Sequence, residues 1–124
     1  MYNITSLPDF LYHCTPKRNI EKILKEGLSP NYSNSSLAGV FLALYEDIAD
    51  NYSFMKDDEC VTLKIKTCNI NEDFLIPDNY ELRDFIEQNY TNFNSYKECN
   101  FIDSLNLCGQ CAYTLVISPE DIIF

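Results

Sequence analysis

The chain has few of the residues on which several common kinds of functional site depend. It contains only three glycines in 124 residues, which leaves no room for the glycine-rich loop that cradles phosphates in nucleotide-binding proteins. Neither an HExxH zinc motif nor a GxSxG nucleophile elbow occurs. No apolar run is long enough to span a bilayer. These absences exclude the P-loop, zincin and α/β-hydrolase classes and a membrane-spanning helix.

Basic residues are also scarce. Lys and Arg number 9 against 19 Asp and Glu, which gives a formal net charge of -10. This balance repels phosphate backbones, so nucleic acid is not the expected main partner, although Lys17, Arg18, Lys22 and Lys25 could form a local basic patch. A basic protein partner and simple solubility both fit the acidity.

Composition predicts one domain covering residues 1–124. Hydrophobic residues make up 46% of the chain, enough for a single core. The first ten residues, MYNITSLPDF, lack the charged and apolar regions of a signal peptide. We therefore expect a cytoplasmic, reducing location and free thiols at all six cysteines. They are Cys14, Cys60, Cys68, Cys99, Cys108 and Cys111.

Patterns in the first half of the chain predict two short strands, each followed by a helix. Residues 10–12 are expected to form a strand that precedes a helix with Thr15 as its N-cap. Gly27 is expected to end that helix. Residues 40–43 then predict a buried strand, and a helix should run from it through Tyr52.

In the second half, VTLKIK at residues 61–66 alternates strictly between apolar and polar side chains and predicts a half-buried strand. Asp78 is expected to cap the start of a helix. Residues 111–117 give the clearest strand pattern, and residues 122–124 predict a terminal edge strand, whereas residues 89–106 give no clear prediction. Strands and helices are mixed without a regular βαβ rhythm, which favours an α+β fold.

His13 is the only histidine, and it lies at the end of the first predicted strand. Imidazole is the only side chain whose ordinary pKa lets it change charge near neutral pH, so His13 is the first candidate for a functional group. The alternative is a structural histidine that caps the helix beginning after Thr15. A Ser-His-Asp arrangement would need partners that no local pattern supplies.

Two segments around His13 carry a family resemblance. LYHCTPKRNIEKILKEGLSP places His13 between a strand and a capped helix, and GVFLALYEDIADNYS places Gly39, Phe41 and Tyr52 along a strand and a following helix. This arrangement resembles the nucleotide-binding half of ADP-ribosyltransferases, and residues 108–124 resemble that family more weakly. The resemblance implies an ADP-ribosyltransferase-like fold, with split antiparallel β-sheets, flanking helices and NAD in the cleft between the sheets.

The resemblance also implies roles for individual residues. His13 would bond a ribose hydroxyl of NAD, and the backbone of Cys14, with Thr15 beside it, would hold the nicotinamide amide. Phe41 and Tyr52 would sandwich the nicotinamide ring, because flat aromatic faces suit a partly cationic ring. Cys14 stands where the family usually has glycine, and Phe41 where it usually has tyrosine.

The family's third element is a glutamate at the start of a late strand, which stabilises the oxocarbenium-like transition state. Gln110, just before the strand predicted at residues 111–117, is nearest to that position. Its amide can bond a ribose hydroxyl but carries no negative charge. Asp103 or Glu98 could supply an acid from the preceding segment.

The function implied by the resemblance is NAD-dependent mono-ADP-ribosyl transfer to a macromolecule, with a protein favoured as acceptor and with His13 and Gln110 as catalytic residues. The small size and the acidity of the chain would suit a phage or mobile-element effector. One alternative is a catalytically inactive binding protein of the same fold, which would hold NAD, ADP-ribose or a protein partner. RNA 2′-phosphotransfer is a third, disfavoured because Arg18 and Arg83 are the only arginines.

The motif CGQC at residues 108–111 has two further interpretations. A redox C-x-x-C should open a helix, but this motif precedes a predicted strand. Zinc would need two more ligands, which Cys60, Cys68, Cys99 or His13 could supply, but the sequence contains no second close pair. We therefore expect no metal site and ordinary buried thiols.

Overall fold

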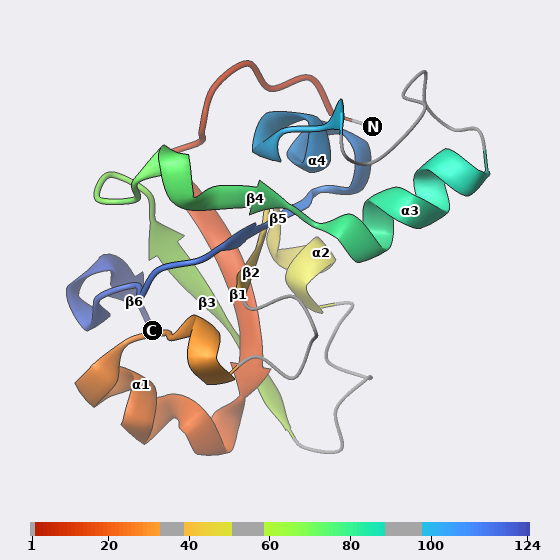
Figure 1. Cartoon of the computed structure of the whole chain (residues 1–124). Helices are drawn as coiled ribbons and strands as arrows, with labels where there is room; N and C mark the ends of the chain where they lie inside the picture. The colour runs from red at the N-terminus through yellow and green to blue at the C-terminus, as the bar shows by residue number, and fades with distance from the viewer. Residues whose placement is uncertain (1, 33–38, 51–58, 89–97) are drawn as a thin grey trace.

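A computed structural model describes residues 2–32, 39–50, 59–88 and 98–124, and the statements below concern these residues. Six strands form a sheet in the order β4-β5-β2-β1-β3-β6, with every neighbouring pair antiparallel (Figure 1). The strands are β1 (Phe10–Pro16), β2 (Val40–Ala43), β3 (Cys60–Lys66), β4 (Leu75–Pro77), β5 (Gln110–Tyr113) and β6 (Ile122–Ile123). The helices are α1 (Ile20–Glu26), α2 (Glu46–Asp50), α3 (Asn79–Glu87) and α4 (Phe101–Cys108).

The sheet is nearly divided at its centre. β1 and β2 share one residue pair, Tyr12 with Ala43, whereas β1 pairs with β3 along all seven of its residues. The α+β class is confirmed. The expectation of two separate sheets differs from this structure, because the Tyr12–Ala43 pair joins the two three-stranded halves into one hydrogen-bonded sheet.

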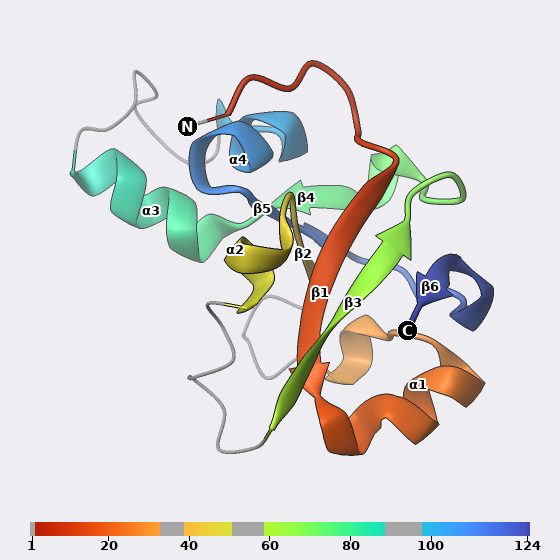
Figure 2. The same cartoon turned by 180° about the vertical axis from the view of Figure 1, so that it is seen from behind.

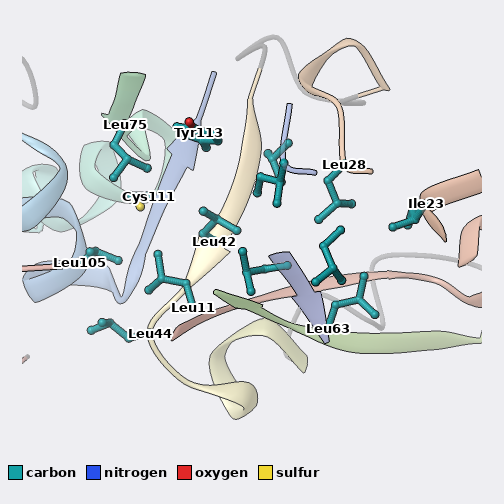
Figure 3. Close-up of a cluster of buried hydrophobic side chains, with 14 residues drawn as sticks. Leu11, Ile23, Leu28, Leu42, Leu44, Leu63, Leu75, Leu105, Cys111 and Tyr113 are labelled. Carbon is teal, nitrogen blue, oxygen red and sulfur yellow. The ribbon is translucent and has the colours of Figure 1, made fainter. Parts of the chain in front are cut away.

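One face of the sheet carries the main core. Leu11 of β1, Leu42 of β2 and Cys111 of β5 are each fully buried there (Figure 3). Leu105 of α4 and Ile23 of α1 pack against the same cluster, and the two helices lie at opposite ends of the sheet (Figure 1). The residues that alternate with this core lie on the opposite face of the sheet.

The opposite face is covered only in part. Behind the sheet, α2 lies beside β1 and β2, and on this side no helix of the described residues covers β1 and β3 (Figure 2). Cys14, Ala43 and Ala49 form a small buried cluster beneath α2. Among the described residues no helix combines the length and the apolarity that a membrane crossing would require.

The first helix starts later than the sequence pattern predicts. β1 continues through Pro16, a 3-10 turn follows at Lys17–Asn19, and only then does α1 begin. Thr15 is therefore a buried strand residue opposite Val61, and its prediction as a helix N-cap was wrong. The long ladder with β3 outweighs the local capping preference. The predicted end at Gly27 is confirmed.

The late strand is shorter than predicted. β5 covers Gln110–Tyr113, and the chain beyond it leaves the sheet, with Leu115 and Val116 exposed. Ile117 instead exchanges backbone hydrogen bonds with Leu28, 2.8 and 2.9 Å long, in the loop after α1. This long-range bridge redirects a segment whose local pattern alone favours a continuing strand.

Candidate functional site

His13 joins the two halves of the sheet just where their backbone ladder ends. Its Nδ1 lies 2.7 Å from the backbone oxygen of Phe41 in β2. A carbonyl oxygen can only accept, so Nδ1 carries a hydrogen and donates it, and in the neutral ring Nε2 is then the acceptor. His13 is thus a side-chain bridge between β1 and β2 and does not cap a helix.

Gln110 begins β5 and lies in one row across three strands. It pairs with Ala43, which in turn pairs with Tyr12. Directly paired residues of antiparallel strands share a face, and so do residues two apart on one strand, so Gln110 lies on the same face as Phe41. His13, Phe41 and Gln110 lie on the adjacent strands β1, β2 and β5. His13 alternates with Tyr12, so it shares the face of Leu11, opposite to the face that carries Phe41 and Gln110.

The Gln110 side chain is buried without full hydrogen bonding. The residue is only 3% exposed, and its Oε1 is the one buried side-chain polar atom of the described residues that has no hydrogen-bond partner. A buried acceptor left unsatisfied costs about 1–3 kcal/mol. Native structures contain few such atoms, and each needs an explanation such as a buried water or a donor from a ligand.

Helix α4 holds the backbone of Gln110. The hydroxyl of Ser104, which is fully buried, donates to the carbonyl oxygen of Gln110. Gly109 ends α4 in the left-handed conformation, with φ at 79°, which allows the chain to turn directly into β5. The position of Gln110 is therefore fixed on one side by the ladder with β2 and on the other by α4.

Neither acid considered as a substitute for the missing glutamate is well suited. Asp103 lies in the first turn of α4, where its carboxylate accepts from the backbone N–H of Asn100 and the Asn100 side chain accepts from that of Asp103. In this capping box the Asp103 carboxylate stabilises the first turn of α4. Glu98 is exposed, before α4 begins.

The remaining predicted cofactor residues differ in their surroundings. Cys14 is buried near Ala49 of α2, and Thr15 is buried next to it in β1, so their side chains point to opposite faces. Phe41 is half-buried. Tyr52, the expected second aromatic of the nicotinamide clamp, lies outside the described residues.

The CGQC motif closes a helix. Cys108 is the last residue of α4, and Cys111 lies within β5. Burial raises the pKa of Cys108 to about 12, with the negative charge of Asp78 acting in the same direction, and burial also raises the pKa of Cys111. Such thiols resist ionisation, which opposes a redox role. All six cysteines are free, and no group of three possible metal ligands occurs among the described residues.

These thiols should be unreactive in the folded protein. At about pH 8, a disulfide-exchange reagent should label the exposed Cys68 quickly, and Cys108 and Cys111 only after unfolding. The pKa of Cys108 is raised above its ordinary 9.0, so the unfolded chain loses that proton first. The free energy of unfolding should therefore fall as the pH rises from 9 towards 12. Rapid labelling of Cys108 in a folded Cys68→Ser variant would contradict this.

Comparison of the sequence with models of known protein families finds no match, and comparison with curated proteins finds none either. The interpretation of the site therefore depends on its own residues.

Proposed function

We propose that the chain is an NAD-dependent mono-ADP-ribosyltransferase whose acceptor is a protein. The observation that carries the proposal is the buried, unpartnered Oε1 of Gln110, on the same face of the sheet as Phe41. A ribose hydroxyl is a donor of the kind that this oxygen needs. The half-buried ring of Phe41 supplies a flat surface for nicotinamide, as the sequence resemblance implies.

His13 supports the same proposal. Its Nδ1–H is engaged by the Phe41 carbonyl, which fixes the ring and directs the acceptor atom Nε2 away from that bond. The hydrogen bond between His13 and the Phe41 carbonyl lies where the two halves of the sheet separate. The sequence resemblance implies a cofactor at this place.

In the proposed reaction the bond between C1′ of the ribose and the nicotinamide nitrogen breaks, and its electron pair stays with nicotinamide, which leaves as a neutral molecule. A nucleophilic side chain of the acceptor bonds to C1′ and loses its proton to water. Gln110 would orient the ribose and present the negative end of its amide dipole to the developing positive charge. An amide carries less charge than a carboxylate, so we expect slower turnover than with glutamate.

The proposal is tested by nicotinamide release from NAD and by transfer of a label in the adenine half to protein. His13→Ala should weaken NAD binding by about 1–3 kcal/mol, because one buried hydrogen bond is lost. Lys66→Ala, exposed on β3, is the matched control and should bind as the wild type does. Binding without nicotinamide release would favour the alternative, an inactive binding protein, which the uncharged Gln110 supports. No binding at all would contradict both.

A further inference from the structure

Asp78 lies beside Gln110 at the end of the sheet. β4 pairs with β5 through Ile76 with Ala112 and Pro77 with Cys111, so one further residue brings Asp78 level with Gln110. Neighbouring strands are about 5 Å apart in this direction. The chain therefore brings a carboxylate next to the residue that stands where the family resemblance implies a glutamate.

Asp78, Ser104 and Gln110 form a buried polar cluster. They are 2%, 0% and 3% exposed, and they make up three of the five buried polar residues among those described. The backbone N–H of Asp78 donates to Ser104 Oγ over 2.9 Å, and that hydroxyl donates in turn to the Gln110 carbonyl. One side chain of α4 thus holds the starts of α3 and β5 together. A cluster so fully buried has little freedom to rearrange.

The carboxylate of Asp78 lies at the N-terminus of α3. Its Oδ1 accepts from the backbone N–H of Glu81 over 3.4 Å, at the positive end of the helix dipole. Burial is the main cause of the raised pKa of Cys108 and of Cys111, and the carboxylate of Asp78 acts in the same direction on the pKa of both thiols.

We propose that Asp78 is a positioning residue of the transferase site: from the end of β4 it supplies the negative charge that Gln110 lacks, while Gln110 makes the contact with the ribose. The inference rests on the proposed function. In this arrangement the positive charge that develops on the ribose is stabilised by a carboxylate held one strand away. The amide between them makes the hydrogen bond that a glutamate would otherwise make.

The first test removes the negative charge of Asp78 and keeps its role as the cap of α3. Asparagine caps helices as well as aspartate does, so Asp78→Asn should fold and melt like the wild type. Nicotinamide release should fall about 10–100-fold, less than the loss of about 100–1000-fold when a directly contacting electrostatic group is removed, while NAD affinity should change less than about threefold. Glu87→Gln, exposed at the far end of α3, is the matched control and should release nicotinamide at the wild-type rate.

The second test moves the charge to the neighbouring strand. Gln110→Glu should raise turnover by a larger factor in the Asp78→Asn variant than in the wild type, because only the variant lacks the charge of Asp78. A purely capping role of Asp78 predicts the same factor in both. Independently of NAD, Asp78→Asn should lower the pH at which Cys108 becomes reactive. Wild-type turnover in Asp78→Asn, or the same factor in both backgrounds, would overturn the inference and leave the proposed function standing. A wild-type protein that binds NAD without releasing nicotinamide would overturn it as well, and one that does not bind NAD would overturn the proposed function itself.

Discussion

Gly27→Ala is expected to destabilise the protein by about 2–6 kcal/mol, from about 1–3 kcal/mol of backbone strain and about 1–3 kcal/mol of overpacking. The backbone angle φ of Gly27 is 78°, a value that residues other than glycine rarely adopt. A Cβ atom there would lie 2.0 Å from the backbone oxygen of Ile117. That oxygen cannot move aside easily, because it accepts a 2.9 Å hydrogen bond from the N–H of Leu28.

Urea unfolding measures this effect. Leu24→Ala, on the same helix and 53% exposed, is the control and should change the free energy of unfolding by less than about 1 kcal/mol. A Gly27→Ala protein as stable as the wild type would mean that the chain does not cross Ile117 at this point. The bridge between the loop after α1 and the segment after β5 would then be wrong.

Gln110→Met is expected to raise stability and weaken NAD binding together. Methionine has nearly the same length and shape as glutamine but no hydrogen-bonding amide, so it relieves the unsatisfied buried Oε1. The free energy of unfolding should rise by about 1–3 kcal/mol. NAD binding should weaken by a similar amount, because the ribose hydroxyl would meet a side chain that cannot accept.

Gln88→Met, at the exposed end of α3, is the control for the same chemical change and should alter neither stability nor binding. A structural role for Gln110 predicts the opposite result, with Gln110→Met less stable than the wild type. A variant that is more stable than the wild type but binds NAD more weakly would show that Gln110 serves binding at a cost in stability.

Local patterns predicted the elements whose residues depend on near neighbours. The strict alternation of Val61–Lys66 predicted β3, with Leu63 and Ile65 buried, and Gly27 predicted the end of α1. The helix expected after Asp78 is also present, as α3. α4 gave no clear pattern, although its capping box is a local signal that the sequence already contains.

Long-range contacts determined the features that local patterns did not predict. Thr15 has a good capping side chain, but the ladder with β3 keeps it in β1. Within the site, the motifs pointed to His13, Phe41 and Gln110. They could not indicate that Ser104 joins Asp78 to Gln110, since those residues are brought together only by the pairing of β4 with β5 and by α4.

The central proposal is that the buried amide of Gln110 contacts NAD. Calorimetric titration of NAD into the wild-type protein and into Gln110→Met tests it most directly. We expect saturable heat with about one NAD bound per chain for the wild type, and binding weakened by about 1–3 kcal/mol for the variant, which should remain folded. No heat from the wild type at roughly millimolar NAD, where even a binding free energy of about -4 kcal/mol would be detected, would contradict the claim. Equal binding by the two proteins would contradict it as well.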